Sequence, residues 1–129
     1  MNRTPHVLVV DDDLVIRESI EALLRDEGYH VTSAENGRVA LAAMATATPD
    51  LVLLDLWMPE MNGWQLSERL RTEAPSVPVV FMTAALLAPD SPLADHPGTV
   101  LTKPFDLDRL LAAVRDALAG RPDPPSGRT

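Results

Sequence analysis

Short runs of apolar or β-prone residues occur at five places along the chain, separated by longer segments of mixed polarity. The runs cover residues 6–10, 29–34, 51–54, 79–82 and 99–102. Apolar runs of this length that end in polar or turn residues are typical of β-strands, and a run without alternating polar positions indicates a strand buried on both faces. The pattern therefore predicts five strands of a largely buried sheet.

The segments between these runs predict helices over residues 14–27, 38–46, 63–73 and 107–118. Residues 38–46 are helical by their alanine content, and two of the other segments show the spacing of one apolar helix face. For 14–27 the predicted inner face is Leu14, Ile16, Ile20, Leu23 and Leu24, and the predicted outer face is Arg17, Glu18, Glu21 and Arg25. For 107–118 the predicted inner face is Leu107, Leu110, Leu111, Val114 and Leu118.

Small polar residues and glycines mark the predicted helix ends. Asp13 is expected to cap the first helix, because a short acidic side chain accepts hydrogen bonds from the free N–H groups at a helix N-terminus. Gly28 and Gly120 are expected to end the first and the last helix. Asn36-Gly37 predicts either a turn or the start of the second helix.

Strands and helices alternate along the chain, which predicts an α/β fold with a doubly wound parallel sheet. We expect one domain over residues 1–120 and a disordered C-terminal tail over 121–129, which holds three prolines. The segment 84–97 contains Pro89, Pro92 and Pro97. Because a proline inside a helix costs ~3 kcal/mol or more, a fourth helix in this segment is expected to be short or degraded.

Composition narrows the function classes. The chain has no cysteine, which excludes disulfides, thiol catalysis and thiolate metal sites. A net charge of −8 argues against direct binding to nucleic acid, which needs a basic face. We also expect a cytoplasmic protein without membrane contact, because no signal peptide and no membrane-spanning apolar run is present. The glycine motifs of dinucleotide-binding folds and P-loops are missing.

Polar residues with the chemistry of a phosphoryl site follow the predicted strands: Asp11, Asp12, Asp55, Thr83 and Lys103. In a parallel sheet these strand ends lie on one edge, where open α/β folds bind their ligands. Carboxylates gathered there repel one another and need a cation, and an oxygen-only ligand set suits Mg²⁺ or Mn²⁺. A carboxylate can accept a phosphoryl group as an aspartyl phosphate, while a hydroxyl and an ammonium group bind its oxygens.

Four motifs together resemble the receiver domain of response regulators in two-component signalling. They are Val9-Val10-Asp11-Asp12, the stretch 53–59 with Asn62-Gly63, Met82-Thr83-Ala84 and Lys103-Pro104-Phe105. The resemblance covers about residues 7–118. It implies a flavodoxin-like, five-stranded parallel sheet with the strand order 2-1-3-4-5.

The resemblance also implies the role of each site residue. Asp55 would accept a phosphoryl group from a phosphohistidine on a sensor histidine kinase or a phosphotransfer protein. Mg²⁺ would be held by Asp11, Asp12, Asp55 and the backbone carbonyl of Trp57. Thr83 and Lys103 would bind the phosphoryl oxygens, and the peptide bond before Pro104 is expected to be cis. Such a protein catalyses only its own phosphoryl transfer and autodephosphorylation, and it signals by changing its binding to an output protein.

One departure and two alternatives accompany this interpretation. Val100 stands where the family usually carries a signalling aromatic residue. Residues 11–15 also read D-x-D-x-V, the nucleophile motif of haloacid-dehalogenase-like phosphatases, which would make Asp11 the nucleophile. A receiver-like scaffold that is never phosphorylated is the other alternative.

The remaining polar candidates receive structural interpretations. Asp50 and Glu60 are expected to be turn residues. His6, His30 and His96 are scattered without the spacing of metal ligands.

Overall fold

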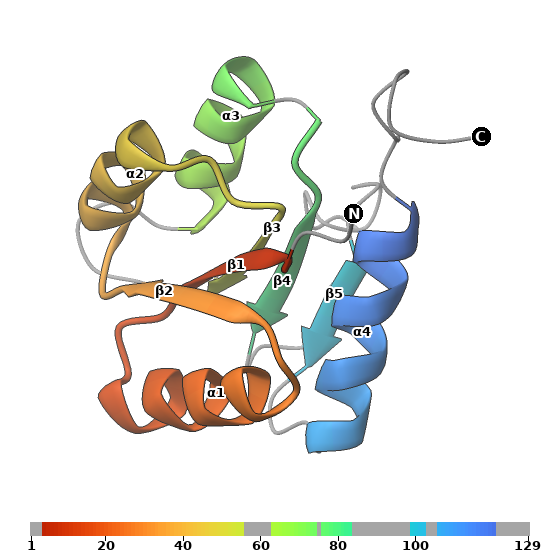
Figure 1. The fold of residues 1–129 in the computed structure, drawn as a ribbon. Helices are drawn as coiled ribbons and strands as arrows, with labels where there is room; N and C mark the ends of the chain where they lie inside the picture. The colour runs from red at the N-terminus through yellow and green to blue at the C-terminus, as the bar shows by residue number, and fades with distance from the viewer. Residues whose placement is uncertain (1–3, 56–62, 75, 84–98, 103–105, 121–129) are drawn as a thin grey trace.

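The computed structural model describes residues 4–55, 63–74, 76–83, 99–102 and 106–120, which form five strands and four helices. The strands are β1 (His6–Val10), β2 (His30–Ala34), β3 (Leu51–Asp55), β4 (Val79–Thr83) and β5 (Thr99–Thr102). The helices are α1 (Leu14–Asp26), α2 (Gly37–Thr46), α3 (Gly63–Glu73) and α4 (Leu107–Gly120) (Figure 1). The short helix predicted in the segment 84–97 and the predicted tail over 121–129 lie outside the described residues. Among the described residues, no helix combines the length and apolar character that crossing a lipid bilayer requires.

The five strands form one parallel sheet in the order β2-β1-β3-β4-β5. This is the strand order that the family resemblance implies, and the parallel sheet is the one that the alternation of strands and helices predicts. The register aligns Val10 with Leu54 across β1 and β3, and Asp55 with Met82 across β3 and β4. The carboxyl ends of the central strands therefore lie side by side at one edge of the sheet, which we call the carboxyl edge.

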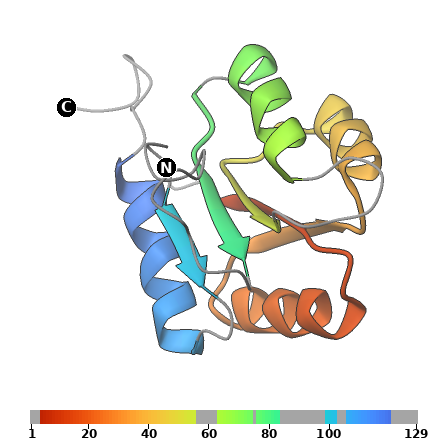
Figure 2. The ribbon, with the colours of Figure 1, turned by 180° about the vertical axis from the view of Figure 1, so that it is seen from behind.

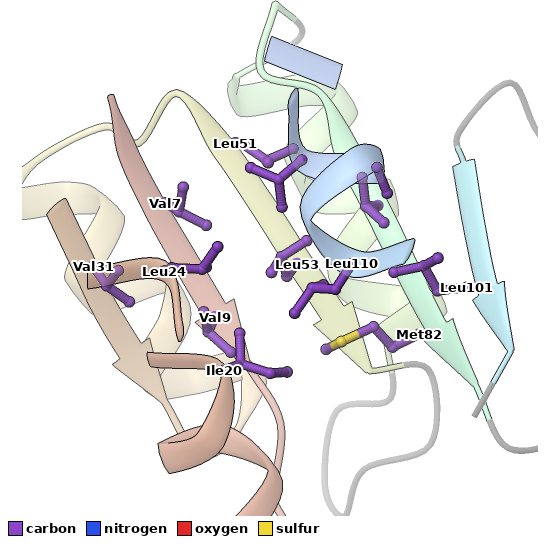
Figure 3. Packing of buried hydrophobic residues seen from close by; sticks show 13 residues of the cluster. Val7, Val9, Ile20, Leu24, Val31, Leu51, Leu53, Met82, Leu101 and Leu110 are labelled. Carbon is purple, nitrogen blue, oxygen red and sulfur yellow. The ribbon is translucent and has the colours of Figure 1, made fainter. Parts of the chain in front are cut away.

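Helices cover the sheet on both faces: α1 and α4 pack on one face, and α2 and α3 on the other (Figures 1 and 2). The side chains of the central strands alternate between the two resulting cores, as the pleat of a strand requires. Val7, Val9, Leu51 and Leu53 pack against α1 and α4 (Figure 3), whereas neighbouring positions such as Leu8 and Val52 pack against α2 and α3. Their complete burial confirms the prediction of strands enclosed on both faces.

The helix ends confirm the predicted caps where the structure describes them. The Asp13 carboxylate accepts a hydrogen bond of 3.1 Å from the backbone N–H of Ile16. Asn36 caps α2 in the same way through Val39, so Asn36-Gly37 starts a helix and is not an isolated turn. Gly28 follows α1 with a φ of +97°, a conformation that glycine adopts without the strain of a Cβ.

The predicted inner faces of two helices are wrong at their first residues. Ile20 and Leu24 are buried as expected, but Leu14 is 54% exposed. Likewise Leu110 and Val114 are buried in α4, whereas Leu107 is 52% exposed. Both exposed leucines occupy the first position of their helix, so the apolar spacing continues in the sequence at positions that the core does not include.

Candidate functional site

Three carboxylates meet at the carboxyl edge of the sheet. Asp11, Asp12 and Asp55 each place a carboxylate oxygen so that all three atoms lie within 4.8 Å of one another. Asp55 is the last residue of β3, and Asp11 directly follows β1, the strand paired with β3. Asp11 is completely buried and Asp55 is only 5% exposed, while Asp12 faces solvent. Sheet register therefore brings together residues that are far apart in the sequence, as the strand-end prediction requires.

The alternation of side chains along β3 explains which side of the sheet carries the cluster. Asp55 continues the series Leu51 and Leu53, whose side chains pack against α1 and α4. Residues two positions apart in a strand point to the same face. Asp55 thus lies on the α1 side of the sheet, where the β1–α1 connection carries Asp11 and Asp12.

Backbone and side-chain hydrogen bonds hold the β1–α1 connection, residues 11–13, in place. The Asp11 N–H donates to the carbonyl of Ala34 at 3.1 Å, which continues the pairing of β1 with β2. The Asp13 N–H donates to Asp11 Oδ1 at 2.9 Å. The Arg17 guanidinium donates through Nη1 to the Asp11 carbonyl at 2.8 Å. These hydrogen bonds fix the conformation of the connection around Asp11 and Asp13.

The donor set fits a small, hard divalent cation. All three ligating groups are carboxylates, and two of them are buried where water screens their repulsion poorly. Two unit charges ~4 Å apart repel by ~4 kcal/mol at an effective dielectric of about 20, so a bound cation would offset a substantial cost. Mg²⁺ and Mn²⁺ prefer oxygen ligands and retain water molecules, and the exposed Asp12 leaves a side of the cluster open to solvent.

The other predicted site residues fall wholly or partly outside the described structure. Thr83 is the last residue of β4 and pairs with Thr102, so its backbone lies at the carboxyl edge, but its side chain is not described. Trp57, Lys103 and Pro104 lie outside the described residues. Their roles in metal binding, phosphoryl binding and the cis peptide therefore stay predictions.

The opposite, amino edge of the sheet shows two features that the sequence did not predict. Asp50, expected to be a turn residue, is a buried carboxylate that accepts the His6 N–H at 2.7 Å. His6 and His30, expected to be scattered, are cross-strand neighbours whose rings lie 4.7 Å apart. His6 Nε2 also forms a hydrogen bond of 2.8 Å with the Thr32 hydroxyl. These contacts depend on the pairing of β1 with β2 and β3, which the sequence pattern does not show. Glu60 and His96, the other residues given structural interpretations, lie outside the described residues.

Arg17 is the residue at the site that sequence reasoning missed. The helical pattern placed it on the solvent face of α1, whereas its side chain is partly buried and contacts the Asp11 carbonyl. A long side chain in the first turn of a helix points back toward the helix N-terminus, and this direction was the available signal. At that end of α1 the side chain meets the β1–α1 connection, residues 11–13, which we call the aspartate loop.

Comparisons with known proteins agree with this geometry. The family model described as "Response regulator receiver domain" matches residues 7–115. The chain is 37% identical over 114 residues to the probable transcriptional regulatory protein TcrX of Mycobacterium tuberculosis, covering 87% of this chain and 49% of that protein. It is also similar to a crystal structure of the response regulator TrrA from Thermotoga maritima in complex with Mg²⁺-BeF, with a TM-score of 0.79, 31% identity, and coverage of 88% of this chain and 99% of that one.

A further relative bears on nucleic-acid binding. The DNA-binding transcriptional regulator NtrC of Salmonella typhimurium is 41% identical over 115 residues, covering 88% of this chain but 24% of that protein. The chain thus spans about half or less of these curated relatives. The charge of this chain led us to expect no direct contact with nucleic acid. A longer relative is nevertheless named as a DNA-binding protein.

Proposed function

The chain belongs to the response regulator receiver domain family, and from this membership we propose that it is a phosphorylatable switch whose phosphoacceptor is Asp55. The observation that carries the proposal is the meeting of the Asp11, Asp12 and Asp55 carboxylates within 4.8 Å at the carboxyl edge. Such a cluster is costly unless a cation joins it, and Mg²⁺ is the cation that its oxygen ligands favour. Asp11, Asp12 and Asp55, with the backbone carbonyl of Trp57, would hold it.

The proposed step is a transfer from a phosphohistidine to Asp55. A carboxylate oxygen of Asp55 forms a bond to phosphorus while the P–N bond breaks. The electron pair of that bond remains on the imidazole nitrogen, which takes up a proton from solvent. Mg²⁺ held by Asp11, Asp12 and Asp55 would supply positive charge that offsets the negative charge of the phosphoryl group. Thr83 and Lys103 would donate hydrogen bonds to the same oxygens, and later attack by water on phosphorus would regenerate the carboxylate and release inorganic phosphate.

Burial supports Asp55 over Asp11 as the nucleophile. Asp11 has no exposed surface, and its Oδ1 already accepts the Asp13 N–H. An incoming phosphohistidine on another protein needs a reachable oxygen, and Asp55 retains some exposure at the strand end. The phosphatase alternative, which requires attack by Asp11, is therefore disfavoured by the complete burial of Asp11 and by the hydrogen bond that its Oδ1 accepts from Asp13.

The proposed partners follow from this role. A sensor histidine kinase or a phosphotransfer protein would supply the phosphoryl group, and phosphorylation would change binding to an output protein or to further domains of a longer chain. We propose the receiver domain over residues 1–120, with 121–129 as a tail. Because Val100 replaces the usual aromatic residue of the family, the output response would not use rotation of an aromatic side chain at this position.

Intact-protein mass spectrometry tests the proposal. The protein would be incubated with acetyl phosphate and Mg²⁺, beside Asp55→Asn and Asp13→Asn. Asp13→Asn is a matched control, because it makes the same chemical change within the aspartate loop at a residue outside the cluster, and asparagine also caps helices well. We expect one added phosphoryl group in the parent and in Asp13→Asn, and none in Asp55→Asn or without divalent cation.

Other outcomes would redirect the proposal. A phosphoryl gain that persists in Asp55→Asn but disappears in Asp11→Asn would place the nucleophile at Asp11. No gain in any variant, even with a histidine kinase as donor, would favour a scaffold that binds partners without phosphorylation.

A further inference from the structure

The aspartate loop, residues 11–13, must hold three consecutive carboxylates between a strand and a helix. Only two of them, Asp11 and Asp12, join Asp55 in the cluster, while Asp13 turns to cap α1. A loop of consecutive like charges tends to spread its side chains apart. Hydrogen bonds to the loop are therefore needed to keep the Asp12 carboxylate near those of Asp11 and Asp55 before a cation binds.

Arg17 joins both ends of this loop. Its backbone N–H donates to the Asp13 carbonyl at 2.9 Å, which is the first hydrogen bond of α1. Its side chain returns to the start of the loop and donates through Nη1 to the Asp11 carbonyl at 2.8 Å. Arg17 therefore holds both Asp11 and Asp13 by their carbonyl groups, and Asp12 lies between these two residues in the loop.

The chemistry of this contact separates positioning from ligand binding. The guanidinium donates to a backbone carbonyl and not to a carboxylate oxygen in this hydrogen bond, so it holds the loop without occupying a position that a cation needs. The planar guanidinium presents its donors in a rigid arrangement, which suits a fixed geometry. Its side chain is partly buried, which strengthens a hydrogen bond from a charged donor.

We propose that Arg17 is a positioning residue for the cation site, and that its bond to the Asp11 carbonyl fixes the loop in the conformation that brings the Asp12 carboxylate to Asp11 and Asp55. The inference rests on the proposed function, because it concerns the cation of that site. Residues that orient metal ligands from behind typically change metal affinity by about 10- to 100-fold when they are removed.

The test measures Mg²⁺ affinity directly, by calorimetric titration of the unphosphorylated protein. Arg17→Met removes the donor but keeps the aliphatic stem. Arg25→Met is the matched control. Arg25 lies on the same helix, and its guanidinium also donates to a backbone carbonyl, that of Val31 in β2 at 3.2 Å, but this contact is outside the aspartate loop. We expect about tenfold weaker Mg²⁺ binding for Arg17→Met and binding within about twofold of the parent for Arg25→Met.

The direction of the change distinguishes positioning from simple charge. If Arg17 acted only as a nearby positive charge, its removal would relieve repulsion of Mg²⁺ and tighten binding. Arg17→Lys keeps the charge but changes the donor geometry, so positioning predicts an intermediate loss, whereas a charge effect predicts parental affinity. Arg17→Lys also carries the test if Arg17→Met fails to fold.

A second measurement needs no metal. Hydrogen exchange of the Asp13 amide, which donates to Asp11 Oδ1, should be faster in Arg17→Met than in Arg25→Met in the absence of Mg²⁺. Unchanged or tighter Mg²⁺ binding in Arg17→Met would overturn the inference and leave Asp55 phosphorylation untouched. Failure of the parent to bind Mg²⁺ would overturn it together with the cation part of the proposed function.

Discussion

The two edges of the sheet use buried aspartates in opposite ways. At the amino edge, Asp50 is 3% exposed, and its carboxylate accepts the N–H of His6 while its own N–H donates to the His6 carbonyl. At the carboxyl edge, Asp11 and Asp55 are also buried, with exposed fractions of 0% and 5%, but each places a carboxylate oxygen within 4.8 Å of the other and of one from Asp12. The Asp50 carboxylate at the amino edge accepts a backbone N–H from the neighbouring strand β1, whereas the carboxyl edge gathers three carboxylates together, although Asp11 Oδ1 there also accepts the Asp13 N–H.

The difference shows what makes a buried carboxylate functional. A carboxylate that accepts a backbone N–H is an efficient clasp between strands, because a hydrogen bond to a charged group contributes about 1.5–3 kcal/mol. Carboxylates placed beside one another store repulsion that a cation can release. Burial of a carboxylate therefore does not identify the site. The presence of other carboxylates beside it does. Four experiments test this contrast.

Mg²⁺ should stabilise the protein through the carboxyl edge alone. At a free Mg²⁺ concentration of 100 times Kd, linkage predicts a rise in the unfolding free energy of about 2.7 kcal/mol. Urea unfolding followed by circular dichroism, with NaCl matching the ionic strength, would measure this increment. Asp55→Ala should lose most of it and Asp50→Asn should retain it. An equal increment in both variants would remove the distinction between the edges.

Removing the clasp at the amino edge should cost stability without Mg²⁺. Asp50→Ala leaves the His6 N–H without its carboxylate acceptor, and we expect a loss of about 2 kcal/mol in the free energy of unfolding. Asp50→Asn keeps an acceptor oxygen of similar reach and should lose less. The same urea titration measures both variants. Equal losses would mean that charge at this position matters more than the hydrogen bond.

Asp13 sharpens the contrast, because it adjoins the cluster yet has a structural role. Asp13→Ala removes the cap of α1 and should lower the unfolding free energy by about 1 kcal/mol. Asp13→Asn should be nearly neutral, since asparagine caps as well as aspartate. Thermal and urea unfolding would compare the two. A large loss of Mg²⁺ affinity in Asp13→Asn would assign Asp13 to the cation site instead.

The smallest effect concerns the repulsion itself. Without divalent cations, Asp12→Asn should raise the unfolding free energy by at most about 1 kcal/mol, because Asp12 is exposed and water screens its charge. The gain in unfolding free energy should shrink in 1 M NaCl, because the Debye length there is only about 3 Å and the repulsion between the carboxylates is screened. Urea unfolding at low and high salt would show it. A loss of stability in Asp12→Asn would contradict repulsion within the cluster.

Local sequence determined much of this protein. Uninterrupted apolar runs determined strands buried on both faces, because neighbouring side chains must enter opposite cores. Asp13 and Gly28 determined the limits of α1 through capping and backbone conformation, which depend only on nearby residues. The aspartates at the strand ends indicated the site, because parallel strands bring their carboxyl ends to one edge.

Contacts between segments were decided only by tertiary structure. Asp50 meets His6, and His6 meets His30, because β1 pairs with both β3 and β2. Leu14 continues the apolar spacing of α1 but is exposed, which the spacing by itself does not reveal. A sequence pattern specifies which face a residue occupies, but the partner on that face depends on which distant segment the fold places there.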